Sequence, residues 1–590
     1  MRKQAPPTAS SPVSKAAESA MKVTRLSGQD GGATIETDLA IVGAGPVGLA
    51  IAGRCARKGI NVLLLESGLE QQDEAHEALN EVIAAASAHD TDLSGRRTAF
   101  HGSQAQLWNA RHQAYGVRSR GLGGSTQVWA GKVAPFDEID FAQRSWVPNS
   151  GWPIGRDELK PFLEQARILL GLCPTEPAPR FSDAGLRSCY WQFARSRSDR
   201  LDVMRFGRDF APELPSNVRV LLDATVTRLG FDPASQSVDA LHVANLSGAS
   251  AIIRPRRVVL AAGAIENPRL LLVSNDVEPG GIGNRQDLVG RYLIDHAGIR
   301  LGEVAGAGNV AKLARTFGFY GQNHAGRSHM FMHGLALSPE LQEQEGLLNA
   351  AIYFAPLRAV DDPFDALKRL LCGQSDGKFR DVAAIIRGMG LIARGIGTKT
   401  LAWPGLPEWT KEMVVGAAIR FAPNMVADEF ASGGLPHKLT GLGIEAITET
   451  APDRSNQILL ADKLDVLGVR LAAAHWRVGP IESRTLRMLA SRLDRAMAVA
   501  GDPAPELADW ARDHGRALPA PVDLAHMMGT TRMAKDRLSG VVDSNCRVFG
   551  ANNLYIAGGS AFPTGGHANP TWMFLALALR LADHLVSAER

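Results

Sequence analysis

Three glycines and one glutamate near the N-terminus have the types and spacing that could bind a dinucleotide. Residues 37–42 are predicted to form a short buried strand, which runs into the turn Gly43-Ala-Gly45-Pro-Val-Gly48 and then into a helix. A second apolar strand follows and ends at Glu66. Gly43 allows the tight turn, Gly45 lets the backbone approach a pyrophosphate, and Gly48 lets helix and strand pack closely.

Glu66 and the helix N-terminus complete the expected chemistry of this turn. Free N–H groups and a partial positive charge at a helix N-terminus favour phosphate. Glu66 lies 18 residues after Gly48, where a carboxylate can accept hydrogen bonds from a ribose diol and disfavours the 2′-phosphate of NADP. A purely structural glycine turn would leave Glu66 unexplained. The pattern predicts a dinucleotide site and does not by itself separate FAD from NAD.

Four further stretches resemble the glucose–methanol–choline (GMC) oxidoreductases, and they follow one another in that family's order. They are residues 120–131, 258–272, 288–296 and the C-terminal set between 526 and 571, which includes His526-Met-Met-Gly-Thr-Thr-Arg-Met and His567-Ala-Asn-Pro-Thr. The resemblance is to the bacterial sugar- or pyranose-oxidising branch. It implies an α/β fold, with a Rossmann-like FAD-binding domain and a second, substrate domain built on a mostly antiparallel sheet with helices.

The flavin contacts are predicted from this resemblance and from residue size. Paired glycines remove side chains where backbone must lie against a flat ring, and the helix after Pro570 can aim its N-terminus at the electron-rich end of a flavin. The predicted cofactor-binding residues are Gly43, Gly45, Gly48, Glu66, Gly123, Gly124, Ser125, Trp129, Val226, Ala262, Gly263, Gly559, Pro570 and Thr571.

The residues Val128-Trp129-Ala130 bear on how the flavin is held and reoxidised. Some members of the family attach flavin through the histidine of a His-Trp-Thr run, and Val128 stands at that histidine's place. We therefore expect non-covalent FAD. The resemblance also links a hydroxyl at the place of Ala130 to oxygen reactivity, so its absence favours a dehydrogenase over an oxidase. Oxygen, a quinone and a cytochrome all stay open as electron acceptors.

Alcohol oxidation by a flavin needs a base for the hydroxyl proton and a hydrogen bond for the developing alkoxide. Histidine suits the first task and asparagine the second, because its amide donates without titrating. The resemblance places His526 and Asn569 in these catalytic roles. His567 is either a second acid/base group or a loop residue, and His296 is expected to be structural.

The predicted reaction is oxidation of a CH–OH group on a sugar, glycoside or polyol to a carbonyl, by hydride transfer to flavin N5 with His526 as base. Two alternatives stay open: a non-redox or non-sugar reaction on the same fold, such as a lyase reaction or alkanol oxidation, and a flavin-binding partner protein without activity.

The predicted domains are discontinuous. Residues 1–36 are expected to be a disordered tail. The FAD-binding domain is predicted to take 37–150, 211–300 and 521–590, and the substrate domain 151–210 and 301–520. The apolar stripe Leu486, Leu489, Leu493 and Met497 has helical spacing and is predicted to be core.

Composition excludes several classes of function. The chain has 590 residues with a formal net charge of +3, so it carries no nucleic-acid footprint. Its five cysteines are dispersed, which argues against a disulfide framework and a zinc site, and no metal site is predicted. The start of the chain lacks the apolar stretch of a signal peptide, so a cytoplasmic location is expected.

Residues 379–403 mix large apolar side chains with arginine and lysine. Two interpretations stay open. The segment is either a basic amphipathic stretch that contacts a membrane surface or a lipid-linked substrate, or a lid or packing helix with solvated charges.

Overall fold

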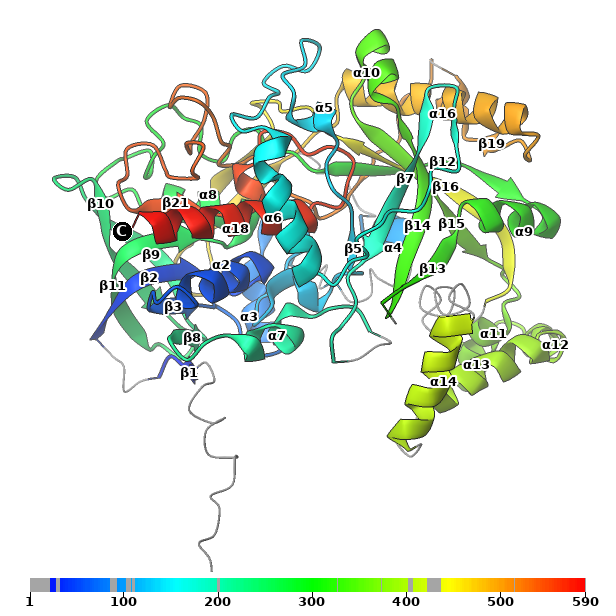
Figure 1. Ribbon diagram of the computed structural model, residues 1–590, viewed down its shortest axis with the longest axis horizontal. Coiled ribbons are helices and arrows are strands. Elements are labelled where there is room, and N and C mark those ends of the chain that lie inside the picture. Colours follow the sequence, from blue (N-terminus) through cyan, green and yellow to red (C-terminus); the bar gives the residue numbers. More distant parts are fainter. Residues whose placement is uncertain are drawn as a thin grey trace, which may run out of the picture.

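Two large sheets organise the protein, with helices around them (Figure 1). The computed structural model describes residues 22–27, 32–84, 93–101, 108, 112–198, 202–325, 327–372, 374–401, 407–421, 437–513 and 515–588. The predicted α/β architecture is confirmed, with a Rossmann-like sheet and a mostly antiparallel one.

The first sheet has eight strands in the order β1-β8-β3-β2-β11-β10-β9, with β21 beside β11. Its central pairings are parallel, whereas β11, β10 and β9 form an antiparallel meander. The strands are β1 (Lys22–Arg25), β2 (Ala33–Val42), β3 (Val62–Leu65), β8 (Val218–Leu222), β9 (Thr225–Asp232), β10 (Ser237–Ala244), β11 (Ser250–Leu260) and β21 (Leu554–Ile556).

The sequence explains why the parallel strands lie at the centre of this sheet. All four residues of β3 are buried, as expected for a strand covered on both faces. Helix α2 (Pro46–Ala56) packs on C-terminal helix α18 (Thr571–Ser587), which also packs on α6 (Arg156–Leu169). Because α2 follows β2 and α18 follows β21, both helices begin at the carboxyl edge of the sheet, where ligands bind in such folds.

The second sheet has ten strands and forms the floor of the other half of the molecule. Along its path β19-β12-β16-β15-β14-β7-β5 the pairings are antiparallel. The strands are β5 (Lys132–Val133), β6 (Ser182–Asp183), β7 (Leu186–Phe193), β12 (His296–Ala305), β13 (Phe319–His324), β14 (Arg327–Leu337), β15 (Ala350–Arg358), β16 (Leu439–Glu449), β19 (Glu506–Leu507) and β20 (Val522–Asp523).

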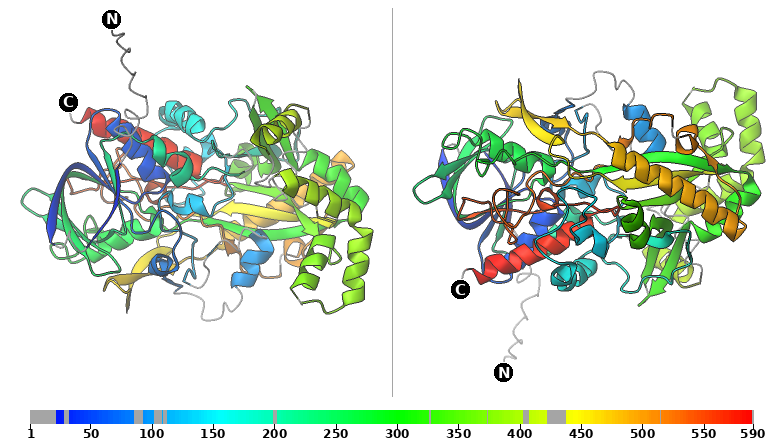
Figure 2. Two further views of the ribbon diagram at one scale, coloured as in Figure 1. Left: turned by 90° about the horizontal axis from the view of Figure 1, so that it is seen from below. Right: turned by 90° about the horizontal axis from the view of Figure 1, so that it is seen from above.

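Helix α16 (Pro480–Ala500) covers one face of this second sheet (Figure 2). Its stripe Leu486, Leu489, Leu493 and Met497 is buried, so the core prediction is confirmed. On β15, Ile352 and Phe354 join that same core, and the alternation of a strand turns Tyr353 to the opposite face.

Several boundaries differ from the prediction. Residues 22–25 and 33–36 belong to strands of the first sheet, although a disordered tail was predicted there: β1 pairs with β8, and the start of β2 pairs with β11. Residues 1–21 and 28–31 lie outside the described part. Strand β5 lies in the second sheet despite falling within 37–150. Strands β17 (Gln457–Leu464) and β18 (Arg470–His475) form a three-stranded sheet in which β18 also pairs with β4 (Val82–Ala84). Both strands pack on α8 (Gly263–Val273), beside the first sheet rather than in the substrate half.

Four helices project from the substrate half, where α14 contacts strands β13 and β14 of the second sheet (Figures 1 and 2). They are α11 (Pro363–Leu371), α12 (Lys378–Arg387), α13 (Met389–Leu401) and α14 (Glu408–Phe421). The predicted segment 379–403 is therefore two helices with a break at Gly388, and Trp403 lies outside the described residues.

The shorter elements connect these layers. They are α3 (Glu74–Glu77), η2 (Ala78–Asn80), α4 (Leu93–His101), η4 (Gly124–Gln127), α5 (Glu138–Phe141), α7 (Phe206–Asp209), η5 (Ala211–Glu213), α9 (Ala307–Thr316), α10 (Pro339–Glu345), α17 (Asp509–Arg512) and η6 (Gly559–Ala561).

Candidate active site

A cavity of about 1450 Å³ is lined by residues of both sheets and their loops. Gly43 and Glu66 line it on the side of the first sheet, Tyr353 lines it on the side of the second, and His526 and Asn569 also line it. The cavity therefore brings together the predicted dinucleotide site and the predicted catalytic pair.

Each of the three glycines in the first turn is a glycine for a different structural reason. Gly43 has φ +106°, and a Cβ there would lie 2.8 Å from the carbonyl oxygen of Ala261. A Cβ on Gly48 would lie 2.0 Å from the oxygen of Gly43, so Gly48 is required by the packing of α2 on its own turn. A Cβ on Gly45 would meet its nearest neighbour, Gly124 Cα, only at 4.0 Å. The fold itself therefore leaves room at Gly45, on the cavity wall.

Glu66 is buried and holds two loops together. Its carboxylate accepts hydrogen bonds from the backbone N–H groups of Ala44 and Gly68, each at 2.9 Å, and of Gly121 at 3.0 Å. Burial raises its pKa, and these N–H donors oppose that shift. Glu66 thus fixes the glycine turn against the 120–124 loop as well as lining the cavity, a structural role that its position in the sequence did not predict.

Most of the predicted cofactor-binding residues line the cavity. Gly48, Gly123 and Pro570 are not part of its lining. Gly123 has φ +100° and donates its N–H to the carbonyl oxygen of Ala44 at 2.8 Å. It therefore joins the 120–124 loop to the glycine turn without lining the cavity. The predicted residues in the lining are Gly43, Gly45, Glu66, Gly124, Ser125, Trp129, Val226, Ala262, Gly263, Gly559 and Thr571.

His526 and Asn569, which are 43 residues apart in sequence, are in contact: Asn569 Nδ2 lies 3.0 Å from His526 Nε2. Asn569 Oδ1 is buried and has no hydrogen-bond partner among the described residues. Because a buried polar atom without a hydrogen bond is destabilising, the free Oδ1 of this amide is available to accept a hydrogen bond from a ligand.

His296 extends the pair into a chain of three residues. Its Nδ1 lies 2.8 Å from His526 Nδ1, and its Nε2 lies 3.3 Å from the carbonyl oxygen of Gly565. One arrangement of protons satisfies every contact: Asn569 donates to His526 Nε2, His526 Nδ1–H donates to His296, and His296 Nε2–H donates to Gly565. His526 is then neutral, with its basic nitrogen on the side of Asn569.

Burial keeps both rings of this chain neutral. It lowers the pKa of His296 to about 4. Burial also holds the pKa of His526 well below its usual range, with smaller electrostatic contributions from its neighbours His296, Lys132 and His101. A neutral histidine is the form that a general base requires.

Asp295 places the two histidines beside each other. One oxygen of its buried carboxylate accepts the backbone N–H groups of His296 at 2.6 Å and of His526 at 3.0 Å. A bridge between Ile294 and Met528 pairs the same two segments. His296 was expected to be structural, and its contact with the proposed base shows a role that no local pattern revealed.

Lys132 was also missed by the sequence analysis. Its Nζ lies 4.4 Å from the ring centroid of Tyr353 and 5.0 Å from that of Trp191, and the residue lines the cavity. Such cation–π contacts stabilise a desolvated ammonium. Burial lowers the pKa of Lys132 to about 8. The positive charge of Lys132 also contributes to the lowered pKa of His526, after burial and His296.

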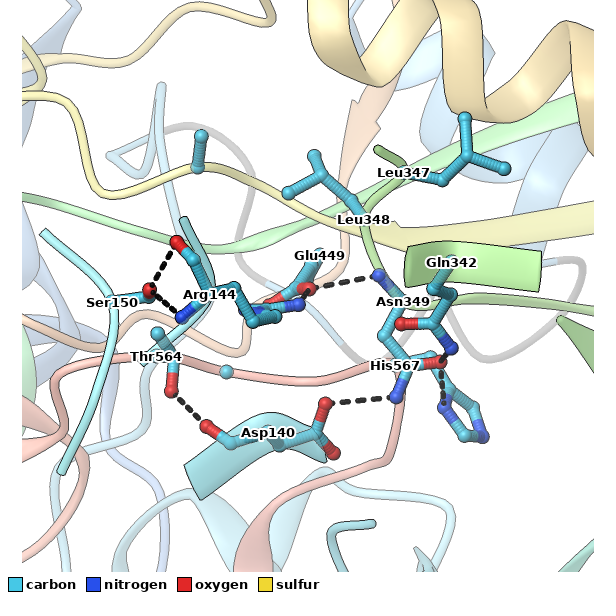
Figure 3. A network of polar contacts seen from close by, with 12 residues as sticks. Asp140, Arg144, Ser150, Gln342, Leu347, Leu348, Asn349, Glu449, Thr564 and His567 are labelled. Carbon is cyan, nitrogen blue, oxygen red and sulfur yellow. Dashed lines mark hydrogen bonds and ion pairs between the residues drawn. The ribbon is translucent and has the colours of Figure 1, made fainter. Parts of the chain in front are cut away.

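His567 lies in a buried polar network instead of the cavity lining (Figure 3). Its Nδ1 lies 3.0 Å from Asn349 Oδ1, and Asn349 Nδ2 donates to Asp140 at 2.8 Å. The backbone N–H of Asn349 donates to Glu449, which forms a buried ion pair with Arg144. His567 thus anchors the loop that carries Asn569, which favours the loop role over the acid/base role.

Comparisons with known proteins agree with this geometry. The family profile described as GMC oxidoreductase matches residues 452–578. The chain is 22% identical to the fructose dehydrogenase large subunit of Gluconobacter japonicus, over 94% of this chain and 98% of that one. It is 22% identical to the 2-methyl-1,2-propanediol dehydrogenase of Mycolicibacterium austroafricanum, over 93% and 95%. The solved structure of a fungal aryl-alcohol oxidase has the same fold, with a TM-score of 0.54 and 14% identity, covering 94% of this chain and 99% of that chain.

Residues 452–578 match the GMC oxidoreductase family, and over nearly its whole length the chain is similar to the two dehydrogenases named above. The family implies FAD as the cofactor. The residues present fit that group: the cavity passes along the glycine turn, where Gly45 leaves space on the wall, and reaches the N-terminus of α18 at Thr571. FAD, when bound, would place its diphosphate at the first of these places and its flavin at the second.

Proposed function

We propose that the protein oxidises a CH–OH group of a sugar, glycoside or polyol to a carbonyl, with His526 as the base and FAD held without a covalent bond. The observation that carries this proposal is the 3.0 Å contact between Asn569 Nδ2 and His526 Nε2 on the cavity wall. The names of two relatives, a fructose dehydrogenase and a propanediol dehydrogenase, favour hydroxylated substrates.

The chain's own residues supply the proton chemistry. Neutral His526 takes the hydroxyl proton at Nε2, where the substrate hydroxyl replaces the N–H of Asn569, while its Nδ1–H stays directed at His296. Asn569 has a second amide N–H that can hold the oxygen as negative charge develops on it. FAD, when bound, supplies the acceptor for the hydride that leaves the carbon.

Non-covalent binding and dehydrogenase activity are supported by the same short stretch. Val128 is buried against the cavity and has no nucleophilic atom to bond to a flavin. Ala130 also lines the cavity and offers no hydroxyl. A quinone or cytochrome is therefore the expected electron acceptor in preference to oxygen.

An alcohol with an apolar body is the second candidate substrate. The cavity wall on the side of the second sheet carries Phe193, Phe319, Met330, Met332 and Tyr353. Apolar and aromatic walls bind apolar surface, and a free sugar gains less from them. Substrates of both kinds need the same base, so this candidate changes only the body of the substrate.

The visible spectrum of the purified protein tests the proposal first. We expect flavin bands that move to the supernatant on acid precipitation, and anaerobic bleaching of those bands by a sugar, a polyol or an apolar alcohol. The His526→Gln variant should keep its flavin and bleach about 10²–10⁴-fold more slowly, since that is the usual contribution of a general base.

His475→Gln is the matched control, because His475 ends β18 and is not part of the cavity lining. It should bleach at the wild-type rate. Equal rates for His526→Gln and the control would reject His526 as the base. Flavin retained in the acid pellet would reject non-covalent binding, and a bound flavin that none of the three alcohol classes bleaches would reject alcohol oxidation itself.

A further inference from the structure

The projecting helices α12 to α14 expose large apolar side chains that a soluble protein usually buries. Phe379 is 95% exposed and Trp409 is 67% exposed. Val382, Ile386, Met389 and Met413 are exposed on the same helices. Most of the exposed large apolar residues of the described chain lie between Val360 and Val414.

Helix α12 is held with its apolar face outward. Phe379, Val382 and Ile386 recur at helical spacing on one side, and Asp381 and Ala384 are buried on the other. Packing of α12 on α11 fixes this orientation (Figure 1).

Two polar contacts and one glycine hold α12 in that orientation. Asp381 accepts hydrogen bonds from Arg369 Nη2 at 2.6 Å and from Ser375 Oγ at 2.7 Å. After the helix, a Cβ on Gly388 would lie 2.5 Å from Pro363, so the chain also packs tightly there. Because the charged group faces inward, the apolar stripe cannot turn into the protein without breaking this ion pair.

The charges beside the stripe decide what can cover it. Lys378, Arg380 and Arg387 are exposed on α12, and the one acidic residue of that helix, Asp381, is paired with Arg369. An apolar stripe edged by positive charge matches the boundary between the headgroups and acyl chains of a bilayer with anionic lipids. On α14, Trp409 and Met413 follow each other at i, i+4, and tryptophan is enriched at that boundary.

We propose that α12 and α14 dock the protein peripherally on an anionic bilayer surface, with Phe379, Ile386, Trp409 and Met413 as the inserted side chains. None of the described helices has the length and apolarity needed to cross a bilayer, so the contact is superficial. Arg358, Arg394 and His437, which come from this projection or its edges, line the active-site cavity. Docking therefore holds one wall of that cavity close to the membrane.

Flotation of the FAD-loaded full chain with phosphatidylcholine vesicles, with or without phosphatidylglycerol, tests the proposal. We expect binding to the anionic vesicles, weaker binding at high salt, and little binding to phosphatidylcholine alone. Phe379→Gln/Ile386→Gln and Trp409→Gln/Met413→Gln should each weaken binding by about tenfold or more, since each double variant removes two apolar side chains that the bilayer would bury. Arg380→Gln/Arg387→Gln should remove the salt dependence.

Ile168→Gln/Leu538→Gln is the matched control, because Ile168 and Leu538 are 60% and 72% exposed elsewhere on the surface. It should bind like the wild type, and flavin content should be unchanged in every variant. No flotation at low salt, or equal loss in the control, would overturn the proposal. So would a concentration-dependent dimer in light scattering that the same substitutions abolish, since a second copy would then cover the surface. Alcohol-dependent bleaching is independent of all these outcomes.

Discussion

At the residue scale, the charge of Lys132 should set the pH range over which His526 works. A base must be neutral, so activity is lost as pH falls through its pKa. His296, Lys132 and His101 all lower that pKa, and Asp295 contacts the backbone of His526. Lys132→Met removes one positive charge, so the pKa of His526 should rise and the acidic limb of kcat/KM should move to higher pH. The pH profile of kcat/KM measures this shift.

Two further variants separate charge from packing at Lys132. Lys132→Arg keeps the positive charge and should keep the limb near its wild-type position. Lys463→Met removes an exposed lysine that pairs with Glu81 and should change nothing. If the acidic limb of the kcat/KM profile stayed at its wild-type pH in Lys132→Met, the charge of the lysine would not act on His526.

At the scale of single elements, the first turn distinguishes a glycine that the cofactor needs from one that the fold needs. Gly45→Ala has room and an ordinary φ of −72°, so the apoprotein should keep its thermal midpoint while FAD binds about tenfold or more weakly. Gly48→Ala places a Cβ 2.0 Å from a backbone oxygen and should destabilise the fold by about 1–3 kcal/mol or more.

Thermal unfolding of the apoproteins and FAD titration measure both effects. Gly155→Ala serves as the control, since its φ is −83° and its Cβ would meet nothing within 4 Å. Unchanged FAD affinity in Gly45→Ala would contradict the assignment of the diphosphate to this turn.

At the scale of the whole molecule, the buried Arg144–Glu449 pair joins the loop after α5 to strand β16 of the second sheet. Both side chains are 1% exposed, so Arg144→Met would leave an unpaired buried charge and should cost about 3–5 kcal/mol of stability. Glu449 also accepts from Asn349, which contacts His567, so the variant should loosen the Asn569 loop and lower kcat.

Thermal unfolding and kcat report the two consequences separately. The control is Arg25→Met, whose partner Glu70 is 48% exposed, and it should change stability by less than about 1 kcal/mol. A loss of stability without loss of kcat would mean that the network holds the loop after α5 on the second sheet but does not position Asn569.

The sequence by itself determined the glycine turn with its strands and helix, the two-sheet architecture, and the candidate pair His526 and Asn569. The turn is encoded in a short stretch, because turns, helix starts and strand patterns depend on neighbouring residues. The two-sheet architecture and the pair His526 and Asn569 were implied by the resemblance to the GMC oxidoreductases. The sequence also indicated a segment of mixed apolar and basic character at 379–403, and left open whether it contacts a membrane or packs as a lid.

The tertiary structure decided which side chains meet. His296 and His526 are 230 residues apart in sequence, and Lys132 finds its aromatic neighbours on separate strands. His567, two residues from Asn569, points into a different environment from it. The apolar face of α12 turns outward because the ion pair of its buried Asp381 with Arg369 holds the opposite face. Such contacts depend on how distant segments pack, and one local sequence pattern is compatible with several packings.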